Sequence, residues 1–310
     1  MNDRILVLLS SYNGAEYIEQ QLDSILNQTL TNIDILVRDD GSVDNTLKIL
    51  RKYQKNYNNI KLIIGQNRGV VKSFFELIRN AELTYDYYVF SDQDDFWKPN
   101  KIEKMIDSMK KYNINEKLGY CSNLILVDKD LNFLKLEYKN ELHPSLKNSF
   151  VENIVTGCTY GANKNMFKKI KENIEIIGEE VDDIPMHDHY FYFLTCLHGK
   201  LIYDPNSYIF YRQHDNNVIG MDNNLLKKLL KRGINVLKRS SNDKRIRYLK
   251  FLINKFENIL PKNEKKYLYE ILNSYPSLIL RVSNINKISF ERQNLYEAKL
   301  LKLLYILKKF

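Results

Sequence analysis

Three aspartates stand within four positions in the stretch SDQDDFW, where Asp92, Asp94 and Asp95 directly follow the apolar run 87–90. Neighbouring carboxylates repel one another, so such a cluster needs either water or a bound cation around it. Mg²⁺ and Mn²⁺ prefer oxygen ligands, and they often combine one or two carboxylates with the phosphate oxygens of a substrate. The cluster therefore predicts a divalent metal site, with a solvated loop or a helix cap as the simpler alternative.

Three further polar clusters also follow short apolar runs. They are SSYNG at 10–14, DDGS at 39–42 and QNRG at 66–69, behind runs at 5–9, 33–37 and 61–64. Helical spacing of apolar residues separates these runs at 15–28, at 44–57 and up to residue 81, and Pro99 opens another helix to residue 112. We expect Asp44 to cap the second helix, with Thr46 and Lys48 facing solvent.

This alternation of strand and helix predicts βαβ units and a mainly parallel sheet with flanking helices. Ligands bind at the carboxyl ends of the strands in open sheets of this kind. The four polar clusters should therefore meet in one crevice, although they are far apart in the sequence.

The remaining chain is expected to form two parts. Strands at 118–128 and 200–214 and a helix at 186–199 would complete an α/β domain over 1–220. Beyond it, helical patterns at 223–239, 243–260, 264–275 and 294–310 predict a basic helical C-terminal region over 221–310.

Charge divides the chain at the same place. Residues 221–310 contain 21 Lys/Arg and 7 Asp/Glu, a net charge of +14, which leaves −5 for residues 1–220 out of the total of +9. A leucine stripe beside lysines and arginines over 225–238 is typical of helices that lie on an anionic membrane surface. A helical subdomain with a solvated basic face is the alternative, and the last helix is a candidate for homo-oligomer formation.

Several classes of protein are excluded by missing patterns. The chain contains no GxGxxG, no GxxxxGK[ST] and no CxxC pair, so phosphates must be bound in another way, and Cys121, Cys158 and Cys196 are expected to be idle thiols. No basic and apolar leader opens the sequence, and no stretch of 18 apolar residues occurs. We expect a cytoplasmic protein, with its basic tail on the inner face of the cell membrane.

Together, the motifs LLSSYNGAEYIEQQLDSILNQT, VRDDGSVDNT, NRGV and SDQDDFWKPNKI resemble those of inverting family 2 glycosyltransferases with a glycosyltransferase-A fold. The similarity covers residues 4–112 and resumes at VTGCTYGANK (155–164), MHDHYF (186–191) and YRQHDNNVIG (211–220). Among members of the family, SDQDDFW together with YRQH is most similar to bacterial rhamnosyltransferases of cell-wall or capsular polysaccharide synthesis.

The resemblance implies a role for each matching residue. Asp40 would accept a hydrogen bond from the N3–H of uracil or thymine, Asp92 would hold the ribose or the metal's water shell, and Asp94 would bind Mn²⁺ or Mg²⁺ directly. The remaining donor pocket would be lined by Ser11, Tyr12, Asp39, Asn67, Gly69 and Arg212, with His214 as a second metal or diphosphate contact.

In the MHDHY motif, the resemblance implies that Asp188 is the general base that takes a proton from the acceptor hydroxyl. One base without a covalent nucleophile implies inversion at the anomeric carbon. Family members usually have an acidic residue before this aspartate, whereas this chain has His187. Adjacent side chains on a helix point in different directions, so His187, Asp188 and His189 should not share a zinc ion.

Alternatives remain open from the sequence. The expected donor is dTDP-rhamnose and the expected acceptor a saccharide, including a lipid-linked one, but UDP-hexoses and UDP-N-acetylhexosamines would suit the same fold. A nucleic-acid-binding protein that uses the basic tail is an alternative of another class; we expect no nucleic acid partner because no recognition motif occurs. Nucleotidyl transfer would need a basic loop near the first strand. Trp97 could either stack on a sugar or pack beneath the metal loop.

Overall fold

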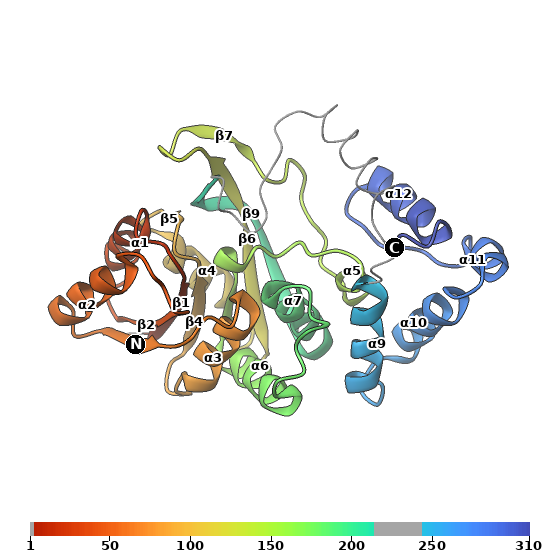
Figure 1. Ribbon diagram of the computed structural model, residues 1–310, viewed down its shortest axis with the longest axis horizontal. Helices are drawn as coiled ribbons and strands as arrows, with labels where there is room; N and C mark the ends of the chain where they lie inside the picture. Colours follow the sequence, from red (N-terminus) through yellow and green to blue (C-terminus); the bar gives the residue numbers. More distant parts are fainter. Residues whose placement is uncertain (1–2, 214–243) are drawn as a thin grey trace. The chain divides into compact units, whose positions relative to one another are not determined.

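The computed structural model describes residues 3–213 and 244–310 (Figure 1). The chain forms two compact units, the first comprising Met1–Pro144, Ile154–Val181 and Met186–His214, and the second Ser145–Asn153, Asp182–Pro185 and Asp215–Phe310. The expected domain boundary at residue 220 lies outside the described residues. Two short segments of the N-terminal part belong to the second unit, which no sequence pattern had indicated.

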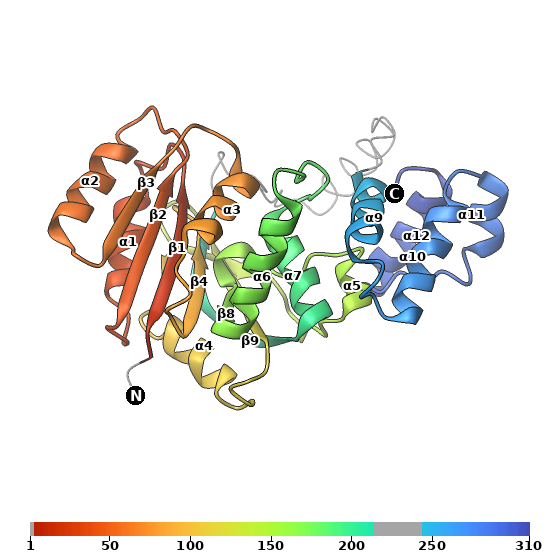
Figure 2. The same ribbon diagram turned by 90° about the horizontal axis from the view of Figure 1, so that it is seen from below.

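The first half of the large sheet is parallel. Strands β1 (Ile5–Ser11), β2 (Ile33–Asp39), β3 (Ile60–Ile64) and β4 (Tyr87–Ser91) lie in the order β3-β2-β1-β4. Ser11 pairs with Asp39, and Leu9 pairs with Ser91, so these strands end at nearly the same level. The predicted parallel sheet is confirmed, and its register brings the polar clusters to one edge (Figure 2).

Helices α1 (Ile18–Leu26), α2 (Thr46–Asn56) and α3 (Val70–Asn80) connect these strands. The connections from β1 to β2 and from β2 to β3 advance in one direction along the sheet, so right-handed crossovers put α1 and α2 on one face. The chain then returns past β1 to β4, which puts α3 on the other face. Tyr53 of α2 accordingly donates a hydrogen bond to Asp23 of α1. Each helix buries an apolar stripe, such as Ile18, Leu22 and Ile25.

The second half of the sheet is mixed. After β4 the order continues through β8 (Gly161–Asn163), β6 (Leu118–Val127), β9 (Lys200–Arg212) and β5 (Phe96–Trp97), and β7 (Phe133–Leu136) pairs with β6. β8 runs antiparallel to both β4 and β6, whereas β6 and β9 are parallel. Helices α4 (Lys101–Met109), α6 (Lys164–Ile177) and α7 (His187–His198) and a short 3₁₀ turn (Gly157–Thr159) complete the unit.

Three local predictions have clear outcomes. Thr46 was expected to face solvent, and this was wrong: its hydroxyl accepts a hydrogen bond from the Gly14 amide and donates one to Asp44, which buries the side chain. The N-cap of α2 is Asn45, one residue after the predicted Asp44, although Asp44 accepts the amide of Thr46, the first residue of the helix. All three cysteines are free thiols, as expected.

The second unit is helical where it is described. It contains α5 (Leu146–Ser149), α9 (Lys244–Phe256), α10 (Lys262–Ser274), α11 (Leu278–Asn284) and α12 (Leu295–Ile306). Phe150 next to α5 stacks on Tyr267 of α10, and Tyr305 of α12 donates a hydrogen bond to the carbonyl of Ile271. Among the described residues, no helix has the length and apolar character needed to cross a membrane.

Candidate active site

The acidic loop, residues 92–95, follows β4 and is hydrogen-bonded to the residue after β1. The side-chain amide of Gln93 donates to the Tyr12 carbonyl at 3.0 Å, and its oxygen accepts the Tyr12 amide N–H at 2.8 Å. A Cβ at Gly14 would collide with this amide group. The Gln93–Tyr12 pair therefore fixes Asp92 and Asp94 beside the first strand, and the absence of a side chain at residue 14 permits it.

Asp92 lies among other acidic groups. Burial of the half-buried carboxyl group, followed by the charges of Asp94 and Asp188, raises the pKa of Asp92 to about 8. The influence of Asp188 has a structural meaning, because Asp188 belongs to α7, almost a hundred residues further along the chain. The fold thus brings the acidic loop and the predicted base into one site.

Asp95 is the most deeply buried member of the acidic loop. It is fully buried, and neither carboxylate oxygen has a nitrogen or oxygen donor within hydrogen-bond distance. Its oxygens, those of Asp92 and the sulfur of Cys158 provide ligand atoms within 4.8 Å of one another. Burial, then the charges of Asp94 and Asp92, raises the pKa of Asp95 well above its usual value. A divalent cation beside these carboxylates would relieve this repulsion.

Trp97 lies beneath the acidic loop. It is 1% exposed, and the Lys101 ammonium lies 3.6 Å from the centre of its ring. Burial lowers the pKa of Lys101 to about 7, against the opposing influence of Cys158 and Asp95. The suggestion that Trp97 stacks on a sugar is therefore wrong for this arrangement, because both the core and Lys101 cover the ring. The alternative of packing beneath the loop is confirmed.

Arg212, at the end of β9, supports the acidic loop from inside the protein. It is 2% exposed; Nε donates to the Asp94 carbonyl at 3.0 Å and Nη2 donates to Gln20 Oε1 at 2.8 Å. Nη1 donates to the Lys129 carbonyl, and the guanidinium lies 4.4 Å from the ring centre of Tyr17. The predicted role in donor binding remains a prediction, whereas the observed contacts connect Arg212 to the backbone of the loop.

Asp40 organises the loop after β3. Its carboxylate pairs with the buried guanidinium of Arg38 and accepts the backbone N–H groups of Arg68, at 2.9 and 3.1 Å, and of Gly69, at 2.9 Å. Gly69 adopts a φ of 81°, which glycine tolerates far better than other residues. Asp40 is 3% exposed, so a nucleobase could reach it only by exchanging with one of these donors. Its predicted contact with a pyrimidine stays a prediction.

The other predicted donor residues surround the same edge. Asp39 is buried and accepts the Ser42 amide and hydroxyl, while Ser11 is buried with no partner for its hydroxyl. Tyr12 is 44% exposed, and Asn67 is exposed, with its side-chain oxygen 3.2 Å from the Gly69 amide. These exposed groups are the ones that a ligand can reach without displacing the core.

Asp188 occupies the first turn of α7, where the helix dipole favours a negative charge. One carboxylate oxygen accepts the His189 amide at 2.7 Å, and the other accepts the Gly157 amide at 3.1 Å. His187 instead stacks on Phe74, with ring centres 3.9 Å apart, and neither ring nitrogen has a hydrogen-bond partner. Burial lowers the pKa of His187 to about 3, so it is a neutral aromatic group of the core.

Sequence reasoning did not find Gln93, Arg38, Lys101 or the roles of Cys158 and Gly157 in the site. Only Gln93 carried a signal, because it stands between two predicted ligands. The predicted metal contact His214 lies outside the described residues.

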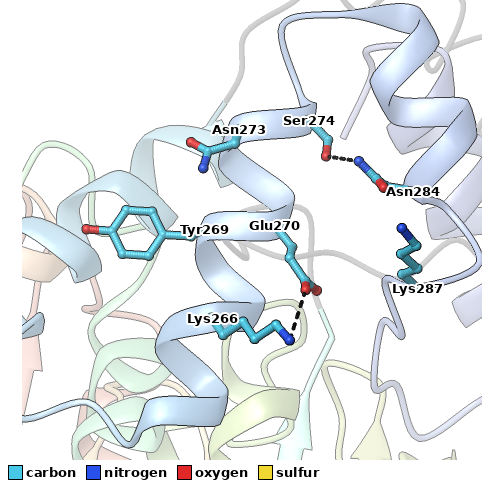
Figure 3. A pocket seen from close by; sticks show the side chains of 7 residues that line it. All are labelled: Lys266, Tyr269, Glu270, Asn273, Ser274, Asn284 and Lys287. Carbon is cyan, nitrogen blue, oxygen red and sulfur yellow. Dashed lines mark hydrogen bonds and ion pairs between the residues drawn. The ribbon is translucent and has the colours of Figure 1, made fainter.

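A pocket of about 430 Å³ lies in the second unit, and none of the predicted site residues lines it. It is lined by Lys266, Tyr269, Glu270, Asn273, Ser274, Asn284 and Lys287 (Figure 3). Its charged Lys266 and Glu270 lie 4.0 Å apart, and the Asn284 amide donates to the Ser274 hydroxyl at 2.9 Å. These internal contacts account for most of its polar groups, so we assign it no ligand.

The fold and the site define a class of protein, which comparison with known proteins confirms. Residues 6–174, more than half of the chain, match the model of glycosyl transferase family 2. The chain therefore belongs to this family and is a glycosyltransferase.

Two relatives show the range of the similarity. The chain is 34% identical over 226 residues to the dTDP-rhamnosyl transferase RfbG of Shigella flexneri, an alignment that covers 68% of this chain and 73% of RfbG. It is 30% identical over 129 residues to a chondroitin synthase of Escherichia coli, covering 39% of this chain and 18% of that protein.

Solved structures share the fold. S. aureus TarS 1–349 in complex with UDP-GlcNAc has a TM-score of 0.59 at 15% identity, covering 99% of this chain and 81% of that one. The mannosyltransferase PcManGT from Pyrobaculum calidifontis, in complex with GDP-Man and Mn²⁺, has a TM-score of 0.53 at 15% identity, covering 100% and 86%. The fold is thus that of glycosyltransferase-A enzymes, as expected from the sequence.

Proposed function

We propose that this glycosyltransferase transfers L-rhamnose from dTDP-rhamnose to a saccharide acceptor in bacterial cell-surface polysaccharide synthesis. The observation that carries the mechanism is the position of Asp188 beside the acidic loop. Its charge and that of Asp94 both raise the pKa of the Asp92 carboxyl group. A base and a diphosphate-binding loop are needed within one site for direct displacement. The similarity to RfbG favours the rhamnosyl donor.

The donor's nucleoside would bind between the loops that follow β1, β2 and β3. Tyr12 and Asn67 offer exposed groups there, and the open space beside Gly69 allows a ligand to approach the backbone. Ser11, Asp39 and Asp40 form the floor. For the predicted contact with the pyrimidine N3–H, Asp40 would release the amide of Arg68 or Gly69 in exchange for the base.

The donor's diphosphate would bind at the acidic loop with a divalent cation held by Asp92 and Asp94, together with His214. The buried Asp95 fits this proposal, since its carboxyl oxygens lie with an oxygen of Asp92 and the Cys158 sulfur within 4.8 Å of one another and are ligand atoms of the kind that a hard cation prefers. A bound Mn²⁺ or Mg²⁺ would neutralise charge on the leaving nucleoside diphosphate. Arg212 and Gln93 would keep the loop in position while this charge develops.

Asp188 would act as the general base. Its carboxylate takes the proton of an acceptor hydroxyl while that oxygen forms a bond to the anomeric carbon, and the bond from this carbon to the diphosphate oxygen breaks. The nucleoside diphosphate leaves with the electron pair, and the anomeric configuration inverts. The Gly157 and His189 amides would hold the Asp188 carboxylate in a fixed orientation before the proton is transferred.

The acceptor in this proposal is a saccharide carried on a lipid, and the enzyme acts at the inner face of the cell membrane. The leucine and lysine stripe at 225–238, which suggested membrane contact, lies outside the described residues. Asp183 forms an ion pair with Arg247 at 3.5 Å within the second unit.

A donor panel tests the proposal. Purified protein is incubated with dTDP-rhamnose, UDP-glucose, UDP-galactose or UDP-N-acetylglucosamine, with Mn²⁺, with Mg²⁺ or with EDTA, and release of the nucleoside diphosphate is measured. We expect metal-dependent turnover and thermal stabilisation with dTDP-rhamnose. Preference for a UDP-sugar would show that dTDP-rhamnose is not the donor. Full activity in EDTA would overturn the metal-dependent mechanism.

A further inference from the structure

The last two helices of the second unit expose an unusual number of large apolar side chains. Ile279 is 79% exposed, Leu295 is 78% exposed and Tyr296 is 83% exposed. Others at 40–56% are Leu278, Leu280, Val282, Leu300, Leu303 and Leu307. Single exposed apolar residues are normal, but a dense group on neighbouring helices marks an interaction site. We call this group the α11–α12 surface.

Helix α12 is apolar on two sides. Leu301, Leu304 and Tyr305 are buried within the unit. Tyr296, Leu300, Leu303 and Leu307 follow one another at spacings of four, three and four residues, so they form a continuous stripe on an exposed side. A helix with one apolar side would suffice for packing against the rest of the unit, so the second stripe requires another explanation.

Helix α11 adjoins the C-terminal end of this stripe. The Arg281 guanidinium is 5% exposed; Nε donates to the Ile306 carbonyl at 3.0 Å and Nη1 donates to the Tyr275 carbonyl. Because this buried arginine binds the last turn of α12, α11 with its exposed apolar residues adjoins the end of the α12 stripe at Leu307. The surface is therefore part of a firmly packed pair of helices.

The charge around the α11–α12 surface is positive. Residues 278–310 contain seven Lys/Arg and two Glu, a net charge of +5. Both glutamates are used within the unit, Glu291 by Lys147 and Glu297 by Arg292. Four lysines of this segment form no ion pair with any described residue: Lys287, Lys299, Lys302 and Lys308.

Apolar side chains flanked by unpaired lysines match one partner particularly well. A second copy of this surface would bring like charges together, which disfavours a symmetric dimer. An anionic lipid bilayer accepts both features, since its acyl region takes up the apolar groups and its headgroups attract the lysines. None of the described helices can span a bilayer, so the contact would be an interfacial one.

We propose that the α11–α12 surface binds the anionic phospholipid surface of a membrane. This deepens the proposed function, because it supplies a contact through which an enzyme acting on a lipid-linked acceptor stays at the membrane. It differs from the predicted contact through residues 225–238, and it concerns the last thirty or so residues of the chain.

The test is vesicle sedimentation with the full chain. Vesicles of phosphatidylcholine alone are compared with vesicles of phosphatidylcholine and phosphatidylglycerol, at low and high salt. We expect binding to the anionic vesicles that weakens with salt, and at least tenfold weaker binding for the double variant Leu300→Gln/Leu303→Gln. The variant Lys299→Gln/Lys308→Gln should lose part of the binding to anionic vesicles. Ile176→Gln, which alters a 74% exposed apolar residue of α6, is the matched control and should bind like the wild type.

Each outcome decides the matter. Absence of binding by the wild-type chain at low salt, or equal binding by Leu300→Gln/Leu303→Gln, overturns the proposal. A dimer in size-exclusion chromatography that this double variant dissociates would assign the surface to a second copy instead. Thermal unfolding checks that the variants are folded. Transfer from a nucleotide-sugar to a water-soluble acceptor is measured separately, so a failure of the proposed function would not be mistaken for a failure of membrane binding.

Discussion

Replacement of Arg212 by lysine tests whether the guanidinium group at the end of β9 holds the acidic loop in position. Arg212 donates three side-chain hydrogen bonds to protein oxygens, among them one to the Asp94 carbonyl. A lysine retains the charge, but its compact ammonium cannot span three acceptors that a planar guanidinium reaches together. The substitution should therefore leave at least two of these three part-buried acceptors without their protein donor.

The expected loss of stability follows from these contacts. A hydrogen bond to a charged group contributes about 1.5–3 kcal/mol, so loss of two predicts a decrease of roughly 3–6 kcal/mol in the free energy of unfolding before relaxation. Rearrangement of the site and entry of water reduce such sums, and we expect about 3 kcal/mol. Because domains are typically stable by about 5–15 kcal/mol, the variant should still fold.

Urea denaturation followed by tryptophan fluorescence measures this loss. Trp97 is the only tryptophan, is buried, and lies three positions after Asp94, so its emission reports on the acidic loop. Arg51→Lys, at an exposed arginine of α2, is the matched control and should change stability little. Mn²⁺ affinity, measured by calorimetry, should fall for Arg212→Lys alone. Unchanged unfolding and unchanged Mn²⁺ affinity in this variant would refute the supporting role of Arg212.

Three further changes address the remaining groups. Asp188→Asn should bind the donor normally but transfer roughly 10²–10⁴-fold more slowly, as measured by steady-state kinetics, because it lacks the base. Asp94→Ala should lose metal-dependent donor binding in calorimetry, since it removes the predicted ligand. His187 has a pKa of about 3 when folded against 6.5 in the unfolded chain, so its burial costs stability as the pH falls below 6.5. By pH 4 this cost is about 3 kcal/mol, from 1.36 kcal/mol per pH unit, and His187→Phe should remove it in acid denaturation experiments.

Different results would assign these roles elsewhere. Wild-type turnover in Asp188→Asn would mean that another group takes the proton. Unaltered metal-dependent donor binding in Asp94→Ala would exclude Asp94 as the ligand. An acid-unfolding profile of His187→Phe that matches the wild type would show that His187 is not the group whose protonation destabilises the fold.

The sequence predicted the parallel half of the sheet well because each strand there is a contiguous apolar run followed by polar residues. The strands β5 and β8 are only two and three residues long, and they are defined by their partners β9, β4 and β6 rather than by a local pattern. Thr46 shows the same limit for a single residue. Its local surroundings predicted exposure, but the Gly14 amide reaches it from another loop.

The site was predictable as a set of positions but not as a set of contacts. Spacing placed Asp40, Asp92 and Asp188 at strand ends or a helix start, where they are found. Spacing carried no information on which donors surround Asp40, and none on the contact between Arg212 and the Asp94 carbonyl, which are 118 residues apart. Such contacts depend on the direction in which a side chain points, and that direction is determined by the tertiary packing around it.

Gln93 forms hydrogen bonds with both backbone groups of Tyr12, so the turn after β1 and the turn after β4 move together. Immobilising either turn immobilises the other, so the entropic penalty for ordering them arises once, whichever end of a donor arrives first. A nucleoside and a pyrophosphate added as separate molecules should then each strengthen the binding of the other.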